Sequence, residues 1–321
     1  MEYRKLGRTG VKVSPFCLGA MMFGQRGNPD HEDCARIIHH AMDAGINFID
    51  TANVYSSGES EEIVGKALKG RRDEVVLATK VHMPMGPGPN DQGNSRVHIL
   101  REVENSLRRL QTDYIDLYQM HRPDPDTPIE ETLDALDSLV RSGKVRYIGT
   151  STFPAWQLVE SYWVSDRNHL ARFECEQPPY SIFVREIERD VLPVCEKYGT
   201  GVIVWSPLNR GWLAGKYRKG QSVDPQSRVG RGDRFIDMPE SAAGERKLDL
   251  VEQLMPLAHD CGANLAQFSL AWTLANPVVT APIIGPRTMD HLEENLKALD
   301  VRIPQDILRK VDELVPPGTT V

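Results

Sequence analysis

The sequence predicts an α/β protein that folds as a (β/α)8 TIM barrel, with an N-terminal hairpin and long loops at the strand ends. Eight short apolar runs, typical of buried strands, alternate with segments that repeat apolar residues at helical spacing. Strands that are apolar on both faces indicate a parallel sheet covered by helices, and eight such units close into a barrel. No linker interrupts the alternation, so we expect residues 1–321 to form a single domain.

The alternative fold for the same alternation of strands and helices is a doubly wound open sheet. That fold usually carries a GxGxxG motif directly after its first strand, where the glycines let the backbone approach a dinucleotide. The first strand expected here runs instead into residues 19–24, Gly-Ala-Met-Met-Phe-Gly, which lack this spacing. The barrel is therefore favoured.

The strands that the barrel requires are separated by helices with recognisable start and stop signals. We expect the strands at residues 16–19, 48–49, 75–80, 115–121, 147–151, 173–177, 202–205 and 281–284. We expect helices at residues 31–44, 61–68, 95–110, 129–141, 155–164, 186–198 and 304–314, with two more before the last strand. A polar hairpin at 2–13 precedes the barrel, and the segment 209–243, rich in Gly, Arg and Asp, is expected to be a functional loop.

Composition excludes several classes of function. The net charge of −7 and the scattered basic residues argue against a nucleic-acid partner. The five cysteines form no CxxC pair, which is typical of a reducing cytoplasm, no signal peptide is recognisable, and no metal site is expected. The uncharged stretch 261–286 is long enough for a membrane span, but its polar side chains and prolines favour a helix followed by a buried strand.

Four polar side chains lie at or near the ends of three consecutive expected strands. Asp50 follows the strand at 48–49, Lys80 ends the next strand, His121 ends the third, and Tyr55 lies on the loop after Asp50. In a barrel the C-terminal strand ends meet on one face, where active sites lie. Each residue alone is commonly structural, as a capping carboxylate, a solvated lysine, a core histidine or a rim tyrosine. Their joint occurrence on one face indicates a catalytic site.

Together these side chains predict proton transfer to a carbonyl group. A phenol is a weak acid at neutral pH, so Tyr55 needs a nearby cation, and Lys80 held by Asp50 supplies it. Tyr55 can then protonate a carbonyl oxygen that His121 orients through a second hydrogen bond. No side chain provides a hydride, so a nicotinamide cofactor is implied.

The chain is similar to the aldo-keto reductases, and it resembles most the branch that includes the potassium-channel β subunits. The resemblance extends over nearly the whole chain, from residues 3–7 to residues 294–295. Its motifs are residues 48–52 with Tyr55, 78–80, 121–125, 143–149, 205–208 and 285–287. It implies a catalytic tetrad made of the same four residues that the charge argument reached, Asp50, Tyr55, Lys80 and His121.

The resemblance also implies an NADPH site on the same face. Trp205 would stack on the nicotinamide, and Ser151 and Gln177 would bind its carboxamide. Arg287 would bind the 2′-phosphate through paired hydrogen bonds, which favours NADPH over NADH. The other residues expected to contact the cofactor are Gly19, Met21, Asp50, Thr152, Ser206, Pro207, Leu208, Arg210, Gly211, Lys216, Arg228, Gly285, His291, Glu294 and Asn295.

Three sites depart from the pattern that is common in this family. Ala20 and Met21 replace a Thr-Trp pair of the channel-type relatives, Thr152 replaces an asparagine, and His291 replaces a glutamine near the adenosine. None of these residues belongs to the expected tetrad.

The leading interpretation is an NADPH-dependent carbonyl reductase with Tyr55 as general acid. Two alternatives stay open, a nicotinamide-sensing partner subunit without catalytic turnover and a reductase of nucleotide-linked keto sugars. A barrel aldolase that uses Lys80 as a Schiff-base amine is disfavoured, because Asp50 keeps that lysine cationic. An apolar or aromatic aldehyde or ketone is expected as substrate, because the pocket would be lined by Met21, Phe23, Tyr55, Met83, Met85 and Trp212.

Overall fold

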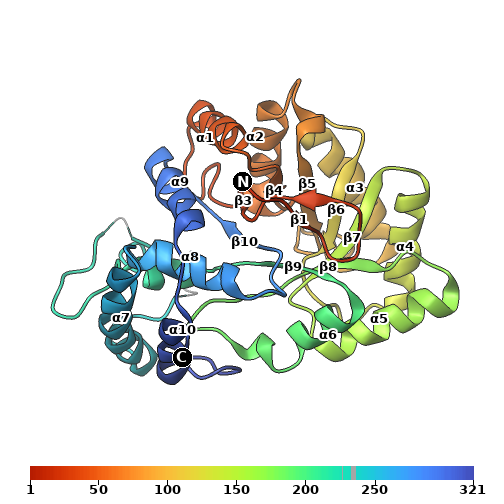
Figure 1. The fold of residues 1–321 in the computed structure, drawn as a ribbon. Coiled ribbons are helices and arrows are strands. Elements are labelled where there is room, and N and C mark those ends of the chain that lie inside the picture. The colour runs from red at the N-terminus through yellow and green to blue at the C-terminus, as the bar shows by residue number, and fades with distance from the viewer. Residues whose placement is uncertain (226, 233–235) are drawn as a thin grey trace.

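The computed structural model confirms the predicted barrel, and it describes residues 1–225, 227–232 and 236–321 (Figure 1). Eight parallel strands follow one another around the barrel in chain order, and the last pairs with the first. They are β3 (Cys17–Gly19), β4 (Phe48–Asp50), β5 (Val76–Val81), β6 (Ile115–Met120), β7 (Val145–Ser151), β8 (Phe173–Gln177), β9 (Gly201–Val204) and β10 (Ala281–Ile284). The expected hairpin is formed by β1 (Arg4–Lys5) and β2 (Lys12–Val13), which pair antiparallel.

Helices surround the barrel on its outside, as Figure 1 shows. They are α1 (His31–Asp43), α2 (Glu59–Ala67), α3 (Arg96–Leu110), α4 (Ile129–Arg141), α5 (Ala155–Asn168), α6 (Val191–Tyr198), α7 (Ala242–Asp260), α8 (Leu265–Ala275), α9 (Met289–Leu296) and α10 (Gln305–Leu314). The helix expected at 186–198 begins only at Val191, because the Asp190 carboxylate caps it there and a separate 3-10 turn, Glu186–Glu188, precedes it.

Two layers of apolar side chains hold the barrel. The inner layer fills its interior with one buried apolar residue from each of seven strands, Cys17, Phe48, Ala78, Leu117, Cys175, Ile203 and Ala281. The hairpin residues Leu6 and Val13 pack against this layer and close the N-terminal end. Gly7 permits that closure, since a Cβ atom at this position would lie 2.4 Å from the backbone nitrogen of Gly201.

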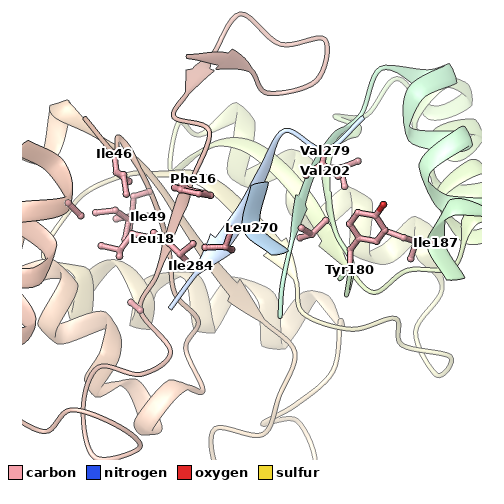
Figure 2. Close-up of a cluster of buried hydrophobic side chains, with 14 of the residues drawn as sticks. Phe16, Leu18, Ile46, Ile49, Tyr180, Ile187, Val202, Leu270, Val279 and Ile284 are labelled. Carbon is pink, nitrogen blue, oxygen red and sulfur yellow. The ribbon is translucent and has the colours of Figure 1, made fainter. Parts of the chain in front are cut away.

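The outer layer lies between strands and helices, where every second strand residue points outward. Figure 2 shows part of it, with Leu18, Ile49 and Ile284 on three adjacent strands and Leu270 of α8 beside Ile284. All four side chains are fully or almost fully buried. At the C-terminal ends of the strands the side chains that point into the barrel include polar ones, and these form the candidate site.

The uncharged stretch 261–286 folds as expected into α8 and β10. Asn264 begins α8 with a capping box, in which Asn264 and Gln267 each bond the backbone nitrogen of the other. Across the described parts of the chain, no helix is both long enough and apolar enough to cross a membrane.

Candidate active site

A buried ion pair between Asp50 and Lys80 lies at the C-terminal end of the barrel. Lys80 is fully buried, and its ammonium group donates to Asp50 Oδ1, to the carbonyl oxygen of Thr51 at 2.8 Å and to Tyr55 Oη at 3.3 Å. Burial opposes the charge, but the attraction of Asp50, followed by that of Tyr55, outweighs it and raises the pKa of Lys80. Lys80 is therefore a cation at neutral pH, and it contacts the phenol directly.

Two glutamines fix the second oxygen of Asp50. Gln119 Nε2 donates to Asp50 Oδ2 at 3.1 Å, and Gln177 Nε2 donates to the same oxygen at 2.9 Å and to Gln119 Oε1 at 3.1 Å. The Asp50 carboxylate thus has three protein donors and is held in one orientation. Sequence reasoning missed Gln119, although it is a polar residue within an apolar strand and pairs in register with Lys80.

Tyr55 lies on a tight loop that directs its ring toward Lys80 and His121. Residues Ser56 and Ser57, which follow it, both adopt left-handed backbone conformations with φ of 48° and 56°. The Tyr55 and His121 rings meet edge to face with centroids 5.8 Å apart, and Lys80 Nζ lies 5.0 Å from the Tyr55 ring centroid. The loop therefore places the phenolic oxygen between the ammonium group and the pocket.

His121 is a neutral imidazole at this site. Burial lowers its pKa well below the ordinary value, and the positive charges of Lys80 and Arg122 lower it further. Its Nδ1 is buried and has no hydrogen-bond partner within the described residues. A neutral imidazole donates only one hydrogen bond, so His121 can orient an oxygen atom without competing with Tyr55 as the acid.

These residues lie on one cavity of about 790 Å³. Asp50, Tyr55 and His121 line its inner end, whereas Lys80 lies fully buried behind Tyr55. The predicted cofactor contacts that line the same cavity are Gly19, Met21, Ser151, Gln177, Trp205, Ser206, Pro207, Leu208, Arg210, Gly211, Lys216, Arg228, Gly285, Arg287, His291, Glu294 and Asn295. The structure therefore brings together every predicted site residue except Thr152, with Lys80 one layer behind.

Three predictions of lining residues are wrong, and a fourth residue, Thr152, which was predicted to contact the cofactor, does not line the cavity. Thr152 adopts a left-handed backbone conformation with φ of 62°, and its hydroxyl lies 3.4 Å from Arg122 Nη1 instead of lining the cavity. Phe23 and Trp212 are fully buried in the core, where Trp212 packs against the Tyr217 ring at 4.9 Å. Met85 also lies outside the cavity lining.

Two of the predicted apolar residues and three residues next to predicted ones contribute apolar side chains to the cavity wall. They are Met21, Met22, Val54, Met83 and Pro84. Sequence reasoning found Met21 and Met83 but missed the remaining three, because their side-chain directions depend on loop conformation.

The outer part of the cavity is strongly basic. Partial burial and the nearby positive charge of Arg287 lower the pKa of Lys216. Burial, Lys216 and Arg287 likewise lower the pKa of His291. Neither Lys216 nor Arg287 forms an ion pair with another described residue. Sequence reasoning missed three further arginines that line the cavity, Arg26, Arg122 and Arg231.

This donor set fits a nicotinamide dinucleotide phosphate. The indole of Trp205 offers a flat apolar face beside Tyr55 and His121, and its buried Nε1 has no partner within the described residues. The amide nitrogen of Gln177 is occupied by Asp50, which leaves its oxygen as an acceptor. The basic part of the cavity offers cations to phosphate groups.

Comparison with known proteins identifies the family. The model of the aldo/keto reductase family matches residues 15–316, and the chain belongs to this family. An uncharacterized oxidoreductase of Bacillus subtilis is 43% identical over 330 residues, which cover 99% of this chain and 97% of that protein. These matches confirm the resemblance inferred from the motifs and support an oxidoreductase.

Two further relatives carry different names. A probable voltage-gated potassium channel subunit beta of Arabidopsis thaliana is 38% identical over 322 residues, covering 98% of this chain and 97% of that protein. Versiconal hemiacetal acetate reductase of Aspergillus parasiticus is 36% identical over 337 residues, covering 98% and 96%. The family thus contains both a reductase and channel subunits at similar identity to this chain.

Proposed function

We propose that this protein is an NADPH-dependent reductase that converts an aldehyde or ketone to an alcohol, with Tyr55 as the general acid. The observation that carries the proposal is the contact of Lys80 Nζ with Tyr55 Oη at 3.3 Å, in a pocket where Asp50 holds the ammonium group. Bound NADPH supplies the hydride, which forms the new bond to the carbonyl carbon. The proposal also places the protein in the cytoplasm.

The side chains of this chain position and protonate the substrate. As the carbonyl oxygen gains negative charge, Tyr55 gives it the phenolic proton, and the Lys80 ammonium group stabilises the phenolate that remains. His121, neutral because of burial and its cationic neighbours, donates a hydrogen bond to the same oxygen. Asp50 keeps Lys80 in place.

The cofactor site follows the cavity outward from Tyr55. Trp205 stacks on the nicotinamide, and Ser151 and Gln177 bind the carboxamide, with the Gln177 oxygen as acceptor. Ser206, Leu208 and Lys216 bind the pyrophosphate. Arg287 binds the 2′-phosphate and Glu294 and Asn295 the adenosine, and because NADH lacks that phosphate, NADPH is preferred.

A panel of aldehydes, ketones and keto sugars, followed by the loss of NADPH absorbance, tests the proposal. We expect steady multiple turnovers with at least one class of carbonyl compound. The names of the channel-subunit relatives favour a second candidate, a cofactor-sensing partner subunit. Tight NADPH binding with no turnover on any carbonyl compound would favour that candidate and overturn the proposed reductase.

A further inference from the structure

Arg122 is a charged residue in the cavity to which the proposed mechanism gives no direct contact. It follows His121 directly, and its guanidinium group lines the cavity beside Tyr55, Trp205 and Ser151. Arg122 Nη1 donates to the carbonyl oxygen of His121 at 2.5 Å, with weaker contacts to the Ser151 and Thr152 hydroxyls at 3.5 and 3.4 Å. These contacts all use one nitrogen, so Nε and Nη2 have no acceptor among the described residues.

No protein carboxylate neutralises this guanidinium. Within the described residues Arg122 forms no ion pair; burial lowers its pKa, and Glu176 is the only described carboxyl group that contributes to raising it. Glu176 is fully buried and accepts hydrogen bonds from the Thr150 hydroxyl and the backbone nitrogen of Phe153. Burial raises the pKa of Glu176 to about 7, so this carboxyl group carries only part of a negative charge at neutral pH.

The proposed cofactor does not account for Arg122 either. Its phosphate groups are assigned to the basic part of the cavity around Lys216 and Arg287. Arg122 lies at the other end, with its guanidinium carbon 5.9 Å from the centre of the Trp205 ring. The nicotinamide that would stack on Trp205 carries no negative charge, and it becomes positive when it gives up the hydride. An unpaired guanidinium beside it would oppose that change unless an anion lies between them.

The remaining carboxylates of the cavity are already paired. Asp50 is bound by Lys80, and Glu294 is bound by Lys297 at the outer end. The same cavity is also lined by apolar side chains, among them Met21 and Met83. The inner part of the cavity therefore combines apolar side chains with the planar Arg122 guanidinium, whose Nε and Nη2 have no acceptor among the described residues.

We propose that Arg122 is a specificity-determining residue that binds an anionic group, a carboxylate or a phosphate, on the carbonyl substrate. The inference rests on the proposed reductase function and narrows its substrate to carbonyl compounds that carry a negative charge near the reacting carbon. The planar guanidinium matches both oxyanions, because it can offer two parallel N–H donors. The anion also screens the positive charge that develops on the nicotinamide.

Matched pairs of aldehydes test this inference. We compare 3-carboxybenzaldehyde with its methyl ester, and glyceraldehyde 3-phosphate with glyceraldehyde, for the wild-type enzyme with NADPH. Since a charge-assisted pair contributes about ten- to a hundredfold in affinity, KM should be lower by about that factor for the charged member of at least one pair. The pair that shows the preference distinguishes a carboxylate from a phosphate substrate.

The variant Arg122→Met removes the charge and keeps much of the stem. We expect kcat/KM for the preferred charged aldehyde to fall by about ten- to a hundredfold, mainly through KM, while the neutral partner changes little. Arg122→Lys should restore part of the preference, because it returns the charge without the planar fork. Arg167→Met, which removes an exposed arginine of α5 that stacks on Trp163, is the matched control and should behave as wild type.

Two kinetic outcomes would overturn the inference. One is a wild-type preference for the neutral member of both pairs. The other is an equal loss of kcat/KM for charged and neutral substrates in Arg122→Met. Equal losses would assign Arg122 to positioning His121 through its carbonyl contact. Where Arg122→Met does not fold, the wild-type comparison and Arg122→Lys still decide.

A binding measurement separates this inference from the proposed function. Calorimetric titration of the protein loaded with NADP+ with 3-(hydroxymethyl)benzoate and its methyl ester requires no turnover. Tighter binding of the acid, lost in Arg122→Met, supports the anion site even if no aldehyde is reduced, in which case only the reductase function fails. Equal binding of acid and ester at wild type would overturn the anion site while leaving the reductase function intact.

Discussion

The inner and outer ends of the cavity differ in how their charges are paired. At the inner end Lys80 contacts three oxygen atoms, and the Asp50 carboxylate accepts from Lys80 and two glutamines. At the outer end Lys216 and Arg287 form no ion pair among the described residues, and their mutual repulsion contributes to the lowered pKa of Lys216. The catalytic ion pair at the inner end is thus organised before any ligand binds, whereas Lys216 and Arg287 at the outer end would gain their partners from the phosphate groups of the proposed cofactor.

This difference separates positioning from binding. A buried ion pair adds little to stability, but removal of one partner leaves an uncompensated charge and is costly. Such a pair suits a site whose geometry must stay fixed during proton transfer. The repulsion between unpaired cations is relieved when phosphate groups bind. Such cations therefore suit a site that determines affinity for the cofactor and the choice between cofactors.

The largest expected effect follows from Tyr55→Phe at the inner end. This substitution removes only the phenolic oxygen, so carbonyl reduction should fall by about two to four orders of magnitude while NADPH affinity stays near the wild-type value. Steady-state rates and cofactor titrations measure the two quantities. Tyr3→Phe, which changes an exposed tyrosine directly before the hairpin strand β1, is the control. Retained turnover in Tyr55→Phe would remove Tyr55 from the mechanism.

Lys80→Met breaks the ion pair and leaves Asp50 buried without its cation. We expect a loss of about 3–5 kcal/mol in the free energy of unfolding, measured by urea denaturation. Carbonyl reduction should also slow, because the phenolate that remains after proton transfer loses its stabilising cation. The double variant Asp50→Asn with Lys80→Met should recover part of the lost stability. If Lys80→Met reduces the carbonyl compound at the wild-type rate, Lys80 does not act on the phenol.

Glu176 extends the comparison, because it is an inner carboxyl group without a bonded cation. Burial raises its folded-state pKa to about 7, so its proton stabilises the fold at low pH and this contribution is lost as the pH rises from about 4.5 to 7. Between pH 5 and pH 8, wild type should lose about 2–3 kcal/mol more stability than Glu176→Gln. Denaturation curves at both pH values measure this. Parallel pH dependences of the two proteins would contradict it.

Arg287→Ala tests the outer end. One charge-assisted interaction contributes about 1.5–3 kcal/mol, so NADPH affinity should fall by roughly ten- to a hundredfold while NADH affinity changes little. Quenching of tryptophan fluorescence, to which Trp205 should contribute, follows both titrations. Arg302→Ala, which removes an exposed arginine that bonds only nearby backbone oxygens, is the control. Equal losses for the two cofactors would assign Arg287 to the fold or to the adenine.

Much of the fold could be predicted from the sequence, because strand and helix periods alternate without interruption. The residues at strand ends followed from the same reasoning, since parallel strands deliver Asp50, Lys80 and His121 to one face regardless of loop detail. The boundary of α6 was predicted less well, because the Asp190 cap competes with a turn that also has helical character.

Side-chain direction in loops could not be predicted. Trp212 is an aromatic residue in a loop of the site, but it packs into the core against Tyr217. Thr152 follows a strand end, but a left-handed backbone turns its hydroxyl toward Arg122. Gln119 and Arg122 act through contacts that depend on the register of neighbouring strands and on the path of a side chain. Neither property leaves a periodic signal in the sequence.

The most direct test of the central claim is the fate of the hydride. NADPH carrying deuterium at the transferred C4 position is incubated with the protein and a carbonyl compound from the panel, and the alcohol is examined by mass spectrometry. The proposed mechanism predicts one deuterium on the carbinol carbon with wild type and a large loss of labelled product with Tyr55→Phe. An alcohol that forms without deuterium, or forms equally with both proteins, would contradict hydride transfer assisted by Tyr55.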